Sequence, residues 1–236
     1  SVFFVRVLKN TLILSLYSVI FGFPAPIIFA LLLNELDNEY YKKVIQVVSY
    51  MPNFISTVVI SGIIIDFVAS DGVITGMLVN IGFLKEAKNL LSVPQYFRTI
   101  MVLTDLWQQV GFGSILFLAA LTGIDQELYE AAVIDGAGPL SLFFKIIMPL
   151  LKPTMVTCFI LQFMTVWSDF LTPLYLSSKS RLFPMTMAVY QFFGKNKSYW
   201  NYIFADIVLT CIPVIIVYMI GQKYIVGGMT SGAVKE

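Results

Sequence analysis

Four aspartates interrupt or close apolar stretches of the chain that otherwise carry no charge: Asp66, Asp105, Asp169 and Asp206. An ionised side chain in the middle of a hydrocarbon layer costs about 3 kcal/mol or more unless it is paired or hydrated. Each carboxylate should therefore face protein, water or the edge of a bilayer. Asp66 and Asp206 lie within about one helical turn of the end of their stretches, and we expect both to be hydrated.

The other two acids have neighbours that suit a ligand with many hydroxyl groups. Asp105 is followed by Trp107 and Gln108, and Asp169 follows Trp167. Sugars are bound by hydrogen bonds to their hydroxyl groups and by stacking on aromatic rings. These five residues are therefore candidates for the lining of a carbohydrate pathway. A structural role is equally open, for example if the second acid fixes a helix kink at the proline that follows it.

The composition of the 236-residue chain is that of a membrane protein. Hydrophobic residues make up 58% and charged residues 12%, whereas soluble domains average about 45–50% and about 25%. A net charge of +1 argues against nucleic-acid binding, which needs a basic surface. The chain has no histidine, and Cys158 and Cys211 lie far apart in apolar runs. We therefore expect no catalytic residues, no metal site and no nucleic-acid partner, and we interpret the chain as a membrane protein that is not itself an enzyme.

Five runs are long enough to cross a bilayer, which takes about 20 mostly apolar residues in a helix. They are Thr11–Asn34, Val44–Ile65, Thr99–Ile124, Pro153–Ser178 and Tyr202–Gln222. The apolar stretches Gly72–Leu84 and Leu140–Leu151 are too short to cross, and we expect them to lie at the membrane surface or against another protein. The sequence predicts an all-α, polytopic bundle of five transmembrane helices that forms a single domain over residues 1–236.

Residues 125–152 form a polar interruption whose pattern is typical of a helical hairpin. Asp125 can cap a first helix, and Gly136 can supply the left-handed residue that ends it. Pro139 is well placed in the first turn of a second helix. That helix would carry one apolar stripe, formed by Leu140, Phe143, Phe144, Ile147 and Leu151. The pattern alone leaves open whether the stripe rests on a membrane or on another protein.

The same segment resembles the EAA signature of permease subunits of ABC importers, which reads EAA, three residues, G, nine residues, I, one residue, L and P. The residues at the positions of this signature are Glu130, Ala131, Ala132, Gly136, Ile146, Met148 and Pro149. Met148 replaces the usual leucine, a swap that conserves volume. Residues 118–138, 167–176 and 227–236 also resemble the carbohydrate-uptake branch of these permeases, so the resemblance covers nearly the whole chain.

The resemblance implies a function and a set of partners. Such permeases pair in the membrane, bind two cytoplasmic ATPases through the EAA hairpin, and receive solute from an external binding protein. We expect the pair to be a heterodimer in a bacterial plasma membrane, with ATP and Mg bound by the ATPases and no cofactor in this chain. The sequence has no phosphate-binding loop of the G-x4-G-K-[ST] type. The family usually has a further N-terminal helix, which we expect this chain to lack.

Two signals disagree about the orientation in the membrane. With the EAA hairpin in the cytoplasm, six basic residues lie inside and nine lie outside, against the positive-inside rule. Giving the motif precedence, we predict that Asp125–Lys152 and the tail from Lys223 are cytoplasmic and that Lys179–Asn201 is external.

The resemblance thus favours the permease subunit of an ATP-driven carbohydrate importer, with oligosaccharides as the more fitting substrates. The alternatives are an ion-coupled secondary transporter, for which internal inverted repeats are typical, and a membrane scaffold that transports nothing. Neighbouring genes for a binding lipoprotein and a second permease would favour the importer.

Overall fold

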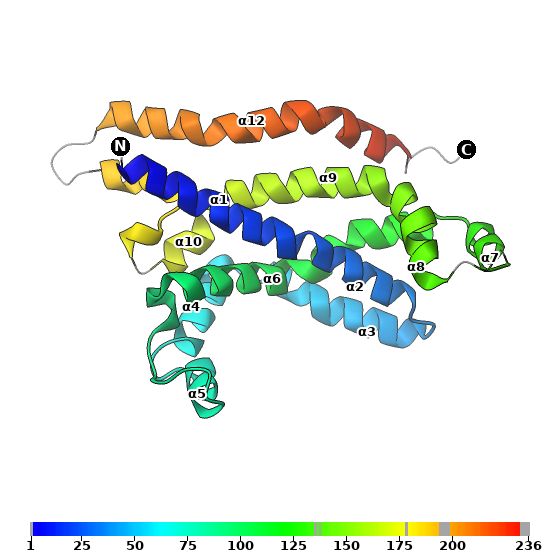
Figure 1. Ribbon diagram of the computed structural model, residues 1–236, viewed down its shortest axis with the longest axis horizontal. Coiled ribbons are helices and arrows are strands. Elements are labelled where there is room, and N and C mark those ends of the chain that lie inside the picture. The colour runs from blue at the N-terminus through cyan, green and yellow to red at the C-terminus, as the bar shows by residue number, and fades with distance from the viewer. Residues whose placement is uncertain (1, 135, 137, 178, 194–198, 232–236) are drawn as a thin grey trace.

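The computed structural model describes residues 2–134, 136, 138–177, 179–193 and 199–231, and every regular element in them is a helix (Figure 1). The α-helices are α1 (Val2–Gly22), α2 (Pro24–Asn34), α3 (Glu39–Tyr50), α4 (Thr57–Phe67), α5 (Val73–Asn80), α6 (Pro94–Thr122), α7 (Gln126–Ile134), α8 (Pro139–Leu142), α9 (Met148–Trp167), α10 (Leu171–Leu176), α11 (Met185–Ala188) and α12 (Trp200–Ser231). Short 3-10 helices are η1 (Met51–Phe54), η2 (Leu90–Ser92), η4 (Ser180–Leu182) and η5 (Val189–Phe192), and η3 (Phe143–Ile147) is a π-helical turn.

Four helical stretches in the described residues are long and apolar enough to cross a membrane: Phe3–Asn34, Pro94–Thr122, Phe143–Leu176 and Trp200–Lys223. In Figure 1 they run along the long axis of the molecule, with α7 and α8 at one end and the start of α12 at the other. They coincide with the first, third, fourth and fifth expected runs. The all-α, polytopic class is therefore confirmed, and four of the five expected crossings have a counterpart, the fourth with a short break between α9 and α10.

The second expected run, Val44–Ile65, is not a straight helix. Glu39–Phe54 and Thr57–Phe67 meet at an angle of 95°, so together they form at most one broken span. The break has a local cause, because Ile55 and Ser56 take extended backbone conformations and the Ser56 hydroxyl accepts the Val59 N–H (3.4 Å), which starts α4. A serine cap in the middle of an apolar run is the signal that predicts such a break.

The first span consists of two helices, α1 and α2, and the junction between them at Phe23 does not interrupt the crossing. Pro24 and Pro26 lie in the first turn of α2, where a missing backbone N–H costs little. The Phe23 N–H still bonds to the Val19 carbonyl (3.2 Å). The stretch also begins earlier than expected, at Phe3, because the helix continues through the basic residues Arg6 and Lys9.

Two groups of buried apolar side chains hold the long helices together. One lies toward the α7 and α8 end and joins α2, α6 and α9: Ile27, Ala30, Phe117, Leu121, Ile147 and Leu151. The other joins α1, α6 and α10 to the connections around α4 and α5: Leu14, Val68, Leu84, Leu90, Leu91, Phe97, Met101, Leu176 and Leu182. In a bilayer such contacts stabilise the bundle by close packing rather than by removal from water.

The middle of α1 is fixed to the segment that leads into α11 by polar contacts. The Asn10 side-chain amide donates to the carbonyls of Arg181 (2.8 Å) and Phe183 (3.2 Å). The Thr11 hydroxyl accepts the Met185 N–H at 2.8 Å. These bonds join parts of the chain far apart in sequence and set the position of the polar residues that follow on α1.

Candidate functional site

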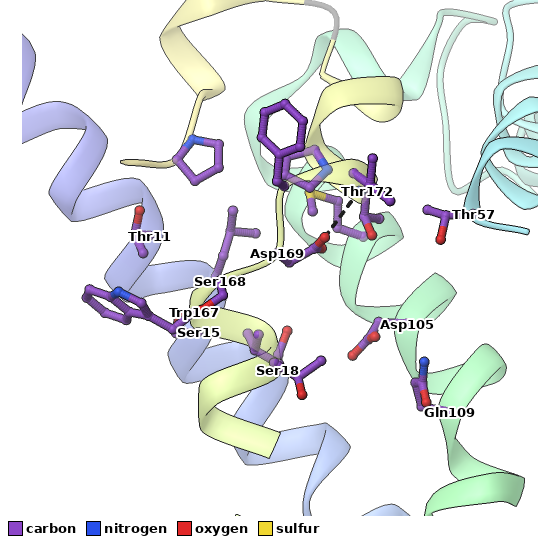
Figure 2. Close-up of a pocket in the computed structure, with 18 of the residues that line it drawn as sticks. Thr11, Ser15, Ser18, Thr57, Asp105, Gln109, Trp167, Ser168, Asp169 and Thr172 are labelled. Carbon is purple, nitrogen blue, oxygen red and sulfur yellow. Dashed lines mark hydrogen bonds between the residues drawn. The ribbon is translucent and has the colours of Figure 1, made fainter. Parts of the chain in front are cut away.

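A cavity of about 360 Å³ lies between α1, α6 and the junction of α9 with α10. Figure 2 shows polar side chains that approach it from these elements and from the start of α4. We call it the polar cavity, and its polar lining residues are Thr11, Ser15, Ser18, Thr57, Asp105, Gln108, Gln109, Thr165, Ser168, Asp169 and Thr172. Trp167 also lines it. The structure thus brings together four of the five sequence candidates and leaves out Trp107.

Asp169 sits where α9 ends and before α10 begins. One carboxylate oxygen accepts the Thr172 N–H at 3.2 Å, the bond drawn in Figure 2. The Asp169 carbonyl accepts a hydrogen bond from the Thr186 hydroxyl at 2.7 Å. The acid therefore helps to start α10, just before the buried Pro173. Both roles left open by the sequence are compatible with this geometry, because the side chain holds a helix start and lines the polar cavity.

Asp105 and Gln108 come from one face of α6. The Asp105 side chain is half-buried and directed into the polar cavity (Figure 2). The Gln108 side-chain amide lines the cavity and donates to the Ile55 carbonyl at 3.2 Å. Ile55 lies in the break between η1 and α4, so Gln108 satisfies a backbone group that the broken helix leaves open. Gln108 is thus part of the support of the cavity wall.

Trp167 is more deeply buried than a stacking platform for a ligand would be. Its side chain is 3% exposed, and its indole N–H donates to the Thr210 carbonyl of α12 at 3.0 Å. Its ring stacks on Phe163, with centroids 5.6 Å apart. The residue therefore anchors α9 to α12 and positions the neighbouring Ser168 and Asp169.

Trp107 does not join the other candidates. Its side chain is half exposed and lines a separate, mainly apolar cavity of about 550 Å³ with residues of α4 and α5 such as Ile64 and Leu78. Residues two apart on an α-helix point about 200° apart, so Trp107 and Asp105 cannot face the same space. Trp107 therefore does not share the polar cavity with Asp105, and its role in a pathway stays a prediction.

Three hydroxyl residues of α1 were missed by the sequence argument. Thr11, Ser15 and Ser18 line the polar cavity and are all buried. The Ser15 hydroxyl has no hydrogen-bond partner within the described part of the chain. Their spacing of four and three residues places them on one helical face, and this polar stripe within an apolar span was the signal that could have found them.

The hairpin of residues 125–152, called the EAA hairpin below, has the predicted helix–turn–helix form. An Asp125 carboxylate oxygen accepts the Glu127 N–H (3.1 Å) and caps the start of α7. Gly136 has φ +77°, the left-handed conformation expected of it. A side chain added at Gly136 would meet no atom within 4 Å, so the glycine is required by its backbone angle and not by crowding.

The signature residues differ in exposure. Ala132 is 6% exposed, Ile146 and Met148 are half-buried, and Ala131 and Pro149 are exposed. The side chain of Glu130 lies outside the described residues. Pro149 stands in the first turn of α9, where it leaves the helix intact. The coupling role of all seven residues stays a prediction.

The sequence suggested that the stretch Leu140–Leu151 is a separate helix at the surface, but the structure shows otherwise. Through the π turn η3, α8 continues into α9, so the stretch forms the entry to the span Phe143–Leu176. Ile147 and Leu151 are buried as the predicted stripe requires, whereas Phe144 is 57% exposed. A π turn holds more residues than an α turn, which moves Phe144 off the buried face. The side chain of Leu140 lies outside the described residues.

The two acids expected to be hydrated behave differently. Asp66 is exposed at the end of α4, as expected. Asp206 is only 6% exposed, so the expectation of simple hydration is wrong there. The residues of α1 and η5 that cover Asp206 are far from it in sequence. Among the described residues, no group of three or more Cys, Asp or Glu side chains could hold a metal ion.

The fold is that of a polytopic helical membrane protein with a polar cavity inside the bundle and a helical hairpin at one end. Residues 6–231 match the family described as "Binding-protein-dependent transport system inner membrane component". The chain belongs to this family, which places it in the inner membrane.

Similar proteins include two from Bacillus subtilis (strain 168). Protein LplB is 41% identical over 160 residues, which are 67% of this chain and 50% of LplB. The polygalacturonan/rhamnogalacturonan transport system permease protein YteP is 37% identical over 159 residues, 67% of this chain and 49% of YteP. The chain therefore spans about half the length of these curated relatives.

A solved structure with a similar fold is the bacterial alginate ABC transporter in complex with an alginate pentasaccharide-bound periplasmic protein. One of its chains has a TM-score of 0.79 and 30% sequence identity to this protein. The match covers 94% of this chain and 77% of that chain.

Proposed function

We propose that this chain is the membrane-spanning permease subunit of an ATP-driven, binding-protein-dependent importer of oligosaccharides. The observation that carries the proposal is the polar cavity, a cluster of hydroxyl, amide and carboxyl groups inside a bundle of this family. YteP is named as a polygalacturonan/rhamnogalacturonan permease. The periplasmic protein in the alginate transporter complex holds an alginate pentasaccharide. Both relatives support a carbohydrate substrate.

The chemistry of the polar cavity favours a neutral sugar. Its described lining residues include the carboxylates of Asp105 and Asp169 and no lysine or arginine. Carboxylates accept hydrogen bonds from sugar hydroxyls, and they repel the carboxylate of an acidic sugar, most strongly where water is scarce. The Ser15 hydroxyl, which has no partner among the described residues, is available to the same ligand. We therefore expect neutral oligosaccharides to be carried in preference to uronic acids.

The partners we propose are a second permease, two ATPases and an external binding protein. None of the side chains of α3 is buried, although the helix carries apolar residues such as Val47 and Val48. A second permease, which we expect to be a different chain, would cover part of this surface and complete the pathway. The periplasmic protein bound to the alginate transporter supports the presence of a binding protein.

The EAA hairpin would supply the contact with the ATPases, which bind the ATP and Mg. Its surface includes Ala131 and Ile134, and Ile134 is 84% exposed. Large exposed apolar side chains beside polar ones are typical of a surface that another protein covers. In this proposal the hairpin is rigidly joined to α9 through η3, so movement of the ATPases reaches the span directly.

The central experiment is transport by the intact complex. The importer would be purified from its native host with its bound subunits, reconstituted in proteoliposomes, and supplied with the binding protein and labelled oligosaccharides. We expect uptake that requires ATP and binding protein and that favours neutral over uronic sugars. Uptake driven by an ion gradient without ATP would indicate a secondary transporter, and assembly without any uptake would indicate a scaffold.

The proposed orientation has its own test. Cys158 and Cys211 would be replaced by alanine, and single cysteines would be introduced at Ser141 and Asn201. In whole cells, a thiol reagent that cannot cross the membrane should label Asn201→Cys but not Ser141→Cys. The opposite pattern would invert the orientation and place the EAA hairpin outside the cell.

A further inference from the structure

A second cavity, of about 400 Å³, lies at the opposite end of the molecule from the EAA hairpin, between α1, η5 and the first turns of α12. We call it the aromatic pocket. Its described lining residues are Phe3, Phe4, Val7, Gln191, Phe192, Tyr202, Ala205, Asp206 and Leu209. The rings of Phe3 and Phe192 meet edge to face at 5.8 Å, and Phe192 and Tyr202 meet at 5.6 Å. The pocket is thus an aromatic enclosure with one acid in its wall.

Among the described residues, the carboxylate of Asp206 in this pocket has one oxygen without a hydrogen-bond donor, and it has no counter-ion in the pocket wall. Asp206 is 6% exposed, and its Oδ2 atom has no hydrogen-bond partner among the described residues. None of the described lining residues carries a positive charge. A buried carboxylate without a donor or a counter-ion is strongly destabilising. A ligand that brings a positive charge and hydrogen-bond donors would remove this penalty.

The rings around the acid define which cation fits. An ammonium group gains energy over the faces of aromatic rings, and it can donate to a carboxylate at the same time. A metal ion would need several oxygen ligands, whereas the described wall offers one carboxylate, with the amide of Gln191 and the hydroxyl of Tyr202 as its other side-chain oxygens. An organic ammonium group with an apolar attachment matches the chemistry of the pocket.

The depth of the pocket indicates where such a group comes from. Asp206 is six residues after the start of α12, about 9 Å along the helix axis. The aromatic residues Trp200 and Tyr202 near that start are exposed, as is typical of the membrane–water boundary. On α12 the apolar side chains of Phe204 and Val208 are also exposed, which suits contact with lipid chains. The pocket therefore lies at the level of lipid headgroups.

We propose that the aromatic pocket binds the ammonium headgroup of a zwitterionic phospholipid, with the carboxylate of Asp206 as its counter-ion. The rings of Phe3, Phe192 and Tyr202 surround the ammonium group, and the acyl chains follow the exposed apolar face of α12. An anionic lipid that lacks the ammonium group brings its phosphate toward the carboxylate and is disfavoured. This site is independent of the transport function proposed above.

The test compares two lipids on the intact importer. The complex would be placed in nanodiscs of phosphatidylethanolamine or phosphatidylglycerol with identical acyl chains, and retained lipid would be counted by native mass spectrometry. We expect wild type to retain phosphatidylethanolamine about tenfold better than phosphatidylglycerol. Asp206→Asn, which preserves shape, should abolish this preference. Asp66→Asn should retain it, because Asp66 is an exposed acid of another helix.

A second set of variants addresses the rings. Tyr202→Phe keeps the ring and should keep the lipid preference, whereas Tyr202→Leu and Phe3→Leu should reduce it. An equal preference in wild type and Asp206→Asn would overturn the proposal. Loss of a partner subunit from Asp206→Asn in both lipids would also overturn it, in favour of a protein cation.

Discussion

The EAA hairpin and the polar cavity each present side chains whose polarity is the opposite of what their location in the bundle would favour. The hairpin lies at the end of the bundle and exposes apolar side chains such as Ile134 and Phe144. The polar cavity lies inside an apolar bundle and buries polar side chains such as Ser15 and Thr11. Under the proposed function, this contrast has one explanation: both regions serve molecules outside the chain, a protein at the hairpin and a polar solute in the cavity.

The largest effect is expected when the turn of the EAA hairpin is strained by Gly136→Leu, which tests whether the hairpin binds another protein. At φ +77° a side chain costs about 1–2 kcal/mol. If that cost falls on the bound conformation, the affinity for the ATPase drops about five- to thirtyfold. We expect the variant to insert and pair with its partner permease, yet to lose stimulation of ATP hydrolysis by loaded binding protein. Hydrolysis and uptake in proteoliposomes measure this.

Gly82 provides a matched control for that variant. It has the same φ of +77°, with no atom within 4 Å of an added side chain, but it lies in the loop after α5. Gly82→Leu should carry a similar local strain and leave coupling unchanged. Glu130→Ala should weaken coupling more mildly than Gly136→Leu, because it removes the contacts of one side chain, whereas a strained turn displaces both short helices. Wild-type coupling in Gly136→Leu would remove the hairpin from the mechanism.

In the polar cavity, the largest effect is expected from Asp169→Ala. Alanine removes both the acceptor for the Thr172 N–H and the carboxylate that lines the cavity. We expect uptake to fall by about tenfold or more, since hydrogen bonds to a charged group are worth about 1.5–3 kcal/mol. Asp169→Asn retains an acceptor for Thr172. If Asn restores uptake fully, the acid acts by starting α10, and if it does not, the charge contacts the solute. The exposed Asp66→Asn serves as the control.

Ser15→Ala should have a smaller effect on the same cavity. Its hydroxyl is buried without a partner among the described residues and lines the cavity, so a sugar hydroxyl can pair with it. Loss of one neutral hydrogen bond is worth about 0.5–1.5 kcal/mol, and we expect about a two- to tenfold loss of uptake at low solute concentration. Ser61 is the control, because its hydroxyl is also buried without such a partner but is not part of the cavity lining. Equal effects of Ser15→Ala and Ser61→Ala would indicate folding rather than solute contact.

The smallest effect is expected from Trp107→Leu. This residue was a pathway candidate by sequence, but it faces the apolar space between α4, α5 and α6. Leucine keeps the surface apolar, so uptake should stay within about twofold of wild type. A loss as large as that of Asp169→Ala would mean that the solute passes on that side of α6. Uptake measured at equal amounts of assembled complex distinguishes these outcomes.

Sequence reasoning was most successful where the determining residues are neighbours. The cap at Asp125 and the left-handed Gly136 depend on local backbone preferences, and both are confirmed. The polar cavity depends on contacts between α1, α6 and α9, which no local pattern specifies. Asp105 could be found as an acid in an apolar run, whereas Ser15 required attention to helical phase. The burial of Asp206 could not be predicted, since η5 and the start of α1 cover it.

The π turn η3 also bears on how this segment can change in evolution. The turn lies between the hairpin glycine and the start of α9, and it begins within the nine-residue spacing from Gly136 to Ile146 and ends one residue beyond it. Deleting or inserting one residue there would rotate everything before it by about 100° and shift it by about 1.5 Å relative to α9. Such a change would turn the hairpin's exposed surface away from the ATPase proposed above, while leaving each helix stable. Substitutions in this segment can therefore accumulate, whereas changes in its length should be rejected.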